Sequence, residues 1–217
     1  HPAWRARIDR RALALYMRHS AVGGEWSIYE GIRKLRPGSL LELGSGDLEA
    51  GALPEPRDYW RLGDVIAEGR DRPWQGGAAA AIDELEQLLL QAVRGQMVSD
   101  VPLGAFLSGG VDSSTIVALM QAQSQRPVKT FTIGFAESAY NEAEHAKVVA
   151  KHLGTDHTEL YVTPQEAMAV IPRLGNIYDE PFADSSQIPT FLVAELARRH
   201  VTVSLSGDAG DELFGGY

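Results

Sequence analysis

The sequence has 217 residues, 44% of them hydrophobic, which suits a folded protein with one substantial domain and a smaller piece, and no apolar run reaches the roughly 18 residues of a membrane span. It contains no cysteine, which excludes disulfides, cysteine zinc sites and a cysteine nucleophile from these residues and fits a reducing, cytoplasmic location. The formal net charge is -9, and because only residues 1–36 are net basic, most of the chain would repel nucleic acid.

The first part of the chain shows no regular alternation of predicted helices and strands. A helix is predicted over residues 9–19, with apolar side chains at helical spacing and Asp9 as its N-cap. A strand is expected after the turn signal Pro37-Gly38. Residues 47–77 are rich in glycine, proline and charge, which is the composition of a linker. The basic residues of the first helix indicate either an anionic footprint or a solvated face.

From residue 78 onward, helices alternate with short apolar strands. Helices are predicted over residues 78–96, 112–123, 141–153, 164–174 and 185–200, and strands over residues 103–107, 128–135, 157–162 and 201–205. This alternation predicts an α/β fold with a doubly wound, mostly parallel sheet. Such sheets bind ligands at the carboxyl ends of their strands.

One glycine-rich loop follows the strand over residues 103–107. It reads Ser108-Gly109-Gly110-Val111-Asp112-Ser113-Ser114 and opens a helix. Glycines let backbone N–H groups close around phosphate oxygens, and the helix N-terminus adds further donors. Asp112 would repel a phosphate unless a cation such as magnesium lies between them. The loop lacks the Gly-Lys-Ser/Thr ending of a Walker A motif, so ordinary P-loop chemistry is not indicated. The alternative to a phosphate-binding role is a tight strand-to-helix turn in which Asp112 is the N-cap of the helix.

An acidic motif follows the last predicted strand. It runs Ser206-Gly207-Asp208-Ala209-Gly210-Asp211-Glu212-Leu213-Phe214-Gly215-Gly216-Tyr217. Its three carboxylates within five positions repel one another unless a metal or a substrate cation offsets them. The flanking glycines indicate close backbone approach to a ligand, and a solvated acidic turn is the alternative.

The segment Tyr178–Ser186 contains Asp179, Glu180 and Asp184. Two interpretations are open: a substrate role, or a cap for the following helix provided by Asp184 or Ser185. His145, His152 and His157 have no spacing typical of metal ligands.

These motifs together resemble the synthetase domain of glutamine-dependent asparagine synthetases. The loop at 108–114 is similar to the pyrophosphate loop of the wider ATP-pyrophosphatase group, and the motif at 206–217 is similar to a signature of asparagine synthetase itself. Residues 9–16 and 28–38 resemble the last part of the family's glutaminase domain. The resemblance implies three parts: an Ntn-type glutaminase remnant over 1–46, a linker over 47–77, and the front of an ATP-pyrophosphatase domain of the adenine nucleotide alpha hydrolase-like (HUP) fold over 78–217.

The resemblance also implies a reaction. ATP activates aspartate as an acyl-adenylate and releases pyrophosphate, and ammonia derived from glutamine then gives asparagine and AMP. The residues implied to bind ATP or pyrophosphate are Leu107, Ser108, Gly109, Gly110, Asp112, Ser113, Ser114, Ile133, Ser206 and Gly207. Asp112 and Asp211 are the implied Mg²⁺ ligands, and Asp208 is the implied acid of the ammonia step. A homodimer is a possible assembly of the parent enzyme.

Two departures limit what this chain is expected to do. The family's glutaminase uses an N-terminal cysteine, which this sequence lacks. The family also places a catalytic lysine downstream of the Gly-Gly-Tyr ending, so the chain is expected to be an excerpt that is inactive alone. The alternatives are a related amide or β-lactam synthetase that activates another acid, and a nucleotide-binding module without catalysis.

Overall fold

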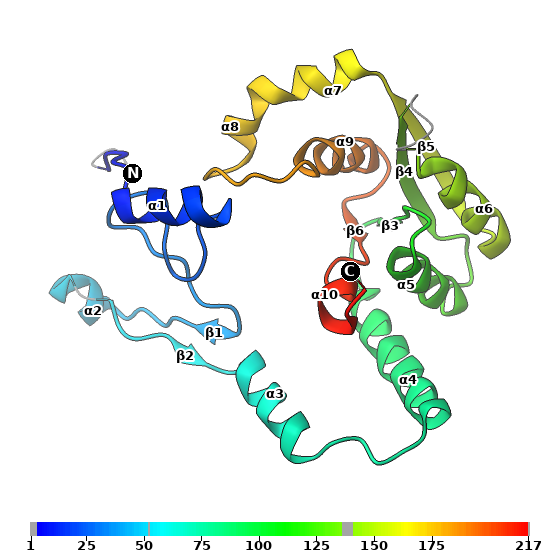
Figure 1. Cartoon of the computed structure of the whole chain (residues 1–217), viewed down its shortest axis with the longest axis horizontal. Coiled ribbons are helices and arrows are strands. Elements are labelled where there is room, and N and C mark those ends of the chain that lie inside the picture. The colour runs from blue at the N-terminus through cyan, green and yellow to red at the C-terminus, as the bar shows by residue number, and fades with distance from the viewer. Residues whose placement is uncertain (1–3, 52, 136–140, 217) are drawn as a thin grey trace. The chain divides into compact units, whose positions relative to one another are not determined.

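The computed structural model describes residues 4–51, 53–135 and 141–216. The chain forms two compact units, one made of residues 1–76 and 174–184, the other of residues 77–173 and 185–217 (Figure 1). Within the described residues, each helix is too short or too polar to cross a bilayer.

The first unit is built around helix α1 (Arg10–His19), close to the range predicted for it. Asp9 is its N-cap, as predicted, and the Asp9 carboxylate accepts a hydrogen bond from the Arg11 N–H at 2.8 Å. Ala12 packs with Val22 and Ile28 in a small buried cluster. The helix therefore contributes one apolar stripe to a core of modest size.

The strand predicted after Pro37-Gly38 has only two residues. It is β1 (Ser39–Leu40), and it pairs antiparallel with β2 (Arg57–Asp58). Helix α2 (Ser45–Ala50) overlaps the start of the segment with linker composition, and helix α3 (Leu62–Asp71) lies within it. Because no residue of α3 is buried, its polar composition reflects exposure on all sides and does not prevent it from being helical.

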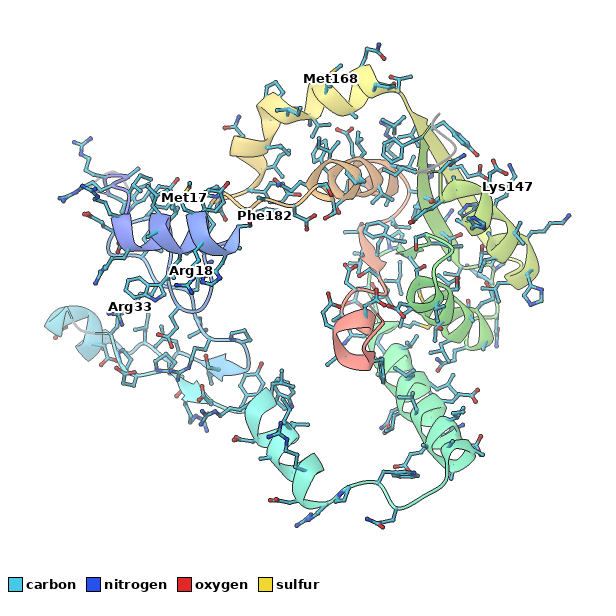
Figure 2. The ribbon with its side chains drawn as sticks, viewed as in Figure 1. Met17, Arg18, Arg33, Lys147, Met168 and Phe182 are labelled. Carbon is cyan, nitrogen blue, oxygen red and sulfur yellow. The ribbon has the colours of Figure 1, made fainter. Side chains whose placement is uncertain are left out.

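The segment 174–184 belongs to this first unit although it lies far along the chain. It begins with helix α8 (Leu174–Ile177). The Glu180 carboxylate accepts from the Ile28 N–H at 3.1 Å and forms an ion pair with Lys34. The Ala183 N–H donates to the Ser20 carbonyl at the end of α1, so the stretch with Phe182 lies beside that helix (Figure 2).

The second unit contains a four-stranded sheet, which confirms the predicted parallel α/β fold. Its strands are β3 (Leu103–Phe106), β4 (Lys129–Phe135), β5 (Asp156–Val162) and β6 (Val203–Leu205). They lie in the order β5-β4-β3-β6, and all three neighbouring pairs are parallel. Gly104 is in register with Lys129 on one side and Ser204 on the other.

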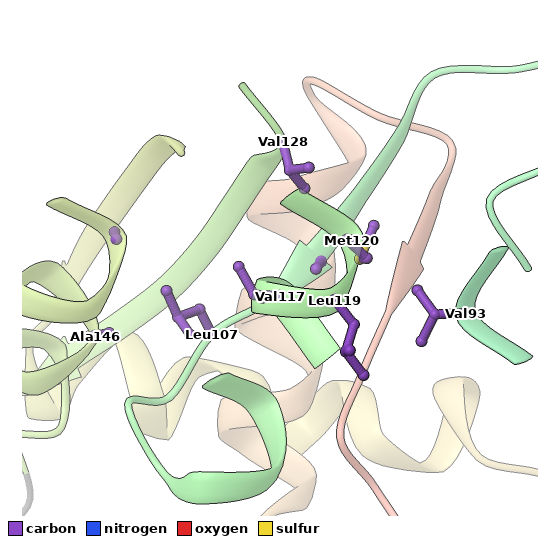
Figure 3. Close-up of a cluster of buried hydrophobic side chains, with 9 residues drawn as sticks. Val93, Leu107, Val117, Leu119, Met120, Val128 and Ala146 are labelled. Carbon is purple, nitrogen blue, oxygen red and sulfur yellow. The ribbon is translucent and has the colours of Figure 1, made fainter. Parts of the chain in front are cut away.

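Helices cover both faces of this sheet. On one face, α4 (Ala78–Gln96), α5 (Val111–Ala122) and α6 (Ala143–Leu153) contribute to a buried cluster that includes Val93, Val117, Met120 and Ala146 (Figure 3). On the other face, α9 (Gln187–Arg198) packs Leu196 and Ala197 on Phe131 of β4. Ala105 and Phe106 of β3 belong to opposite clusters, as the alternation of side chains along a strand requires.

Several predicted boundaries differ from the observed ones. The helix predicted over 164–174 is divided into α7 (Pro164–Val170), a 3₁₀ turn (Ile171–Arg173) and α8, because Pro172 has no N–H for a helical hydrogen bond. The last strand begins at Val203 and not at Val201, because the Val201 N–H donates to the Ala197 carbonyl at the end of α9. The N-cap of α9 is Ser186, so neither Asp184 nor Ser185 takes the capping position considered for it.

Replacing Glu180 should destabilise the first unit. Glu180→Ala leaves the Ile28 N–H and the Lys34 ammonium without this carboxylate, which is only 20% exposed, and should cost about 1–3 kcal/mol. Glu180→Gln should cost less, because an amide oxygen still accepts from Ile28. Urea unfolding followed by tryptophan fluorescence measures this unit alone, since all four tryptophans lie within residues 1–76.

Glu30→Ala is the matched control, because Glu30 pairs with Arg7 on a well-exposed surface and such pairs contribute little. A Glu180→Ala variant no less stable than Glu30→Ala would contradict the role of Glu180.

Candidate functional site

The glycine loop and the acidic motif leave the same edge of the sheet. The loop at 108–114 joins β3 to α5, and the motif at 206–216 joins β6 to α10 (Gly210–Phe214). β3 and β6 are parallel neighbours, so both connections start at their carboxyl ends. The chain continues from β3 to β4 on one side and reaches β6 on the other, so this edge is a topological switch point, where open α/β sheets bind their ligands.

Two glycines allow the acidic motif to lie directly on the loop. A Cβ atom on Gly207 would lie 2.6 Å from the Ser113 nitrogen and 2.7 Å from the Asp112 carbonyl carbon. A Cβ atom on Gly210 would overlap the Asp112 carboxylate. Gly207 and Gly210 were expected to allow close approach to a ligand. In the structure they allow the glycine loop and the acidic motif to contact each other.

The serines of the loop hold it in one shape. The Ser108 and Ser113 hydroxyls lie 2.9 Å apart, and Ser113 Oγ also accepts from the Ser108 N–H at 3.2 Å. The Gly110 N–H donates to Ser108 Oγ at 3.3 Å. Ser114 Oγ is buried and has no hydrogen-bond partner among the residues that the structure describes. Preformed hydrogen bonds of this kind lower the cost of ordering a loop around an anion.

The acidic motif forms a tight turn and one short helix. The Ser206 hydroxyl donates to the Asp208 carboxylate at 2.9 Å. Ala209 has a φ of +73°, in the left-handed region that costs an L-residue energy. The Gly215 and Gly216 N–H groups donate to the Asp211 carbonyl at 2.8 and 3.1 Å. The strained residue Ala209 thus lies between Asp208 and Asp211 in the chain.

Leu107 and Ile133, two of the residues expected to bind ATP, lie at or near the carboxyl ends of the neighbouring strands β3 and β4. The Leu107 side chain is buried in the core, while its N–H donates to the Phe131 carbonyl at 2.9 Å. Ile133 lies on β4 in register with Leu160 of β5. Both backbones therefore lie near the carboxyl edge from which the loop starts.

The donor set at this edge suits magnesium that is shared with a phosphate ligand. The Asp112 carboxylate adjoins Gly210, the residue immediately before Asp211. Within residues 4–51, 53–135 and 141–216, no group of three His, Cys, Asp or Glu side chains is placed to hold a metal by itself. Magnesium typically takes one or two carboxylates and completes its shell with water and substrate phosphates, so two aspartates would be enough for that mode.

A contact that the sequence did not predict lies on the other side of the loop. Gly109 has a φ of +84°, and a Cβ atom there would lie 2.7 Å from both the Ala146 nitrogen and the His145 Cβ. The first turn of α6 therefore packs on the glycine loop. Sequence spacing gave no signal for His145, because its neighbour Gly109 is distant in the chain and contributes only backbone.

Comparison with known proteins identifies the family. A family model described as asparagine synthase matches residues 84–217, more than half of the chain. The chain belongs to the asparagine synthase family. Its relatives include asparagine synthetase 1 (glutamine-hydrolysing) of Bacillus subtilis, 34% identical over 211 residues, which are 97% of this chain and 31% of that protein. A Methanocaldococcus jannaschii protein whose assigned name is asparagine synthetase 2 (glutamine-hydrolysing) is 38% identical over 213 residues, 97% of this chain and 39% of that protein.

The chain thus spans between 31% and 39% of the length of these two curated members of the asparagine synthase family. Among solved structures, an NH3-dependent NAD synthetase from Campylobacter jejuni aligns with a TM-score of 0.43 and 14% identity, over 62% of this chain and 60% of that chain.

Gly207→Ala should disrupt the contact between the two motifs. The added Cβ meets backbone atoms of Asp112 and Ser113, which no side-chain rotation relieves, so we expect a loss of about 1–3 kcal/mol in the free energy of unfolding. The measurement is thermal unfolding by circular dichroism. Gly95→Ala in α4 is the control, because a Cβ there meets nothing within 4 Å and should be neutral or stabilising. Equal stability of the two variants would argue against the close approach.

Ala209→Gly should stabilise the second unit by up to about 1 kcal/mol, because glycine adopts a φ of +73° without strain. The same substitution at Ala80, an exposed position in α4, should destabilise by about 0.5–1 kcal/mol. Differential scanning calorimetry compares the two. If both substitutions lower the melting temperature equally, the turn at Ala209 is not strained.

Proposed function

We propose that this chain supplies the ATP-binding site of a glutamine-dependent asparagine synthetase, which activates aspartate as an aspartyl-adenylate and forms asparagine, AMP and pyrophosphate. The observation that carries the proposal is the contact of Gly207 and Gly210 with Asp112. It joins the phosphate-type loop and the acidic motif into one site at the switch point of the sheet. Membership of the asparagine synthase family supports the same reaction.

The loop residues take the pyrophosphate end of ATP. The N-terminus of α5 and the hydroxyls of Ser108, Ser113 and Ser114 provide donors for its oxygens. Asp112 and Asp211 hold Mg²⁺, which when bound neutralises charge on the phosphates. The backbones of Leu107, Ile133 and Gly207 contact adenosine, and Ser206 completes the nucleotide contacts.

The chemistry needs positioning more than a protein nucleophile. An oxygen of the substrate aspartate carboxylate attacks the α-phosphorus, and the bond to the β-phosphate oxygen breaks to release pyrophosphate. Ammonia then attacks the acyl carbon, loses a proton, and expels AMP. Donors fixed around the pyrophosphate stabilise the charge that develops on it in the first step. Asp208, oriented by the Ser206 hydroxyl at 2.9 Å, acts as the acidic residue of the ammonia step.

We assign the parts of the chain accordingly. Residues 1–46 are the end of an Ntn-type glutaminase domain, residues 47–77 a linker, and residues 78–217 the front part of the ATP-pyrophosphatase domain with its adenine nucleotide alpha hydrolase-like fold. In this proposal the ammonia derives from glutamine, and the family's cysteine nucleophile for that hydrolysis is not among these 217 residues, which contain no cysteine.

The products test the proposal. The protein at its natural length, given ATP, Mg²⁺, aspartate and ammonia, should form AMP and pyrophosphate in equal amounts, measured by ion-exchange chromatography and a coupled pyrophosphatase assay. Replacing aspartate with other carboxylic acids should abolish release. ADP as the product would overturn the proposal, and release with a different acid would indicate a related amide or β-lactam synthetase.

Asp112→Asn should lower the rate by at least about tenfold and raise the Mg²⁺ concentration needed for half-maximal rate, because an amide is a weaker magnesium ligand. Asp156→Asn is the control, since Asp156 is an exposed aspartate paired with Lys129 at the amino ends of β4 and β5. An unchanged Mg²⁺ requirement in Asp112→Asn would remove Asp112 from the metal site.

A further inference from the structure

The candidate nucleotide site is acidic, which leaves its anionic ligand short of positive charge. The loop and the acidic motif, residues 107–114 and 206–216, contain Asp112, Asp208, Asp211 and Glu212 but neither lysine nor arginine. Pyrophosphate carries several negative charges, and one magnesium ion offsets only part of them. A side chain from another element that donates a hydrogen bond to the pyrophosphate would therefore favour its binding.

Helix α6 brings such a side chain to the loop. A Cβ on Gly109 would lie 2.7 Å from the His145 Cβ and 2.8 Å from the His145 carbonyl carbon. His145 is in the first turn of α6 and is exposed to solvent. Helical side chains lean toward the N-terminus, so from the first turn an imidazole extends past the helix end.

Two charged neighbours of His145 on the helix, Glu144 and Lys147, are engaged elsewhere. Glu144 accepts from the Tyr161 hydroxyl at 2.9 Å, and Lys147 lies 3.5 Å from Glu159, so both interact with β5 (Lys147 is labelled in Figure 2). Glu144 and Lys147 share one helix face because they are three residues apart. His145 is rotated by about 100° from Glu144, away from Lys147, and so lies off that face.

We propose that His145 is a phosphate-contacting residue of this site, whose imidazole N–H donates to an oxygen of the pyrophosphate group held by the glycine loop. The assignment rests on the function proposed above and adds to it a contact from outside both motifs. An imidazole retains at least one N–H donor in either protonation state. Gly109 makes the contact possible, because any side chain at that position would push the first turn of α6 away from the loop.

Calorimetric titration of the protein at its natural length with magnesium pyrophosphate, ATP and adenosine tests the role of His145. His145→Ala should weaken magnesium pyrophosphate and ATP by about tenfold, the loss expected for one hydrogen bond to a charged ligand, and leave adenosine unchanged. His145→Arg should restore most of the affinity, because it keeps N–H donors. His152→Ala, two turns further along α6, is the control and should bind all three ligands like wild type.

Equal affinity of His145→Ala and wild type for pyrophosphate would overturn the assignment of His145 and leave the nucleotide site standing. A parallel loss of adenosine affinity would also overturn it, since that pattern indicates structural damage. If wild type binds neither ATP nor pyrophosphate, the proposed function fails, and the role of His145 fails with it.

Discussion

Backbone atoms of the turn after β6 approach the first turn of α5 to within distances that no side chain would tolerate. Gly207 lies over Asp112 and Ser113, and Gly210 lies against the Asp112 carboxylate. Neighbouring strands are only about 4.8 Å apart, so two connections that leave the same edge compete for one space. Removing two Cβ atoms resolves that competition, and the two motifs contact one another directly.

Much of this arrangement could be predicted from local sequence. A short apolar strand, two glycines and a helix predicted the loop after β3, and alternating elements predicted the parallel sheet, because both signals come from residues adjacent in the chain. The strand order was not available from the same signals, because pairing of β3 with β6 depends on contacts between distant residues. The contact between Gly109 and His145 was missed for the same reason. The roles of the individual site residues remain predictions.

Part of the charge in the first unit is balanced by ion-pair partners that composition does not reveal. Arg7 pairs with Glu30, Arg36 with Glu25 and Asp58, and Lys34 with Glu180. Arg11 lies 4.7 Å above the Trp26 ring and also pairs with Asp9. These pairs favour the interpretation of the basic stretch as a solvated face over that of an anionic footprint. The Lys34–Glu180 pair joins a distant segment to this unit, and that segment leads directly into α9.

The strand order also determines when the site is complete. β3, β4 and β5 follow one another along the chain, so each pairing closes a loop of a few tens of residues, whereas the register of Gly104 with Ser204 closes one of about 100 residues. Long loops close at a greater entropic cost, and non-local pairings form slowly. A folding chain would therefore have the glycine loop in place while Asp208 and Asp211 were still detached. The proposed metal–nucleotide complex could then bind only after β6 has docked on β3. Because it would bind the folded site alone, this complex would stabilise the docked state by mass action.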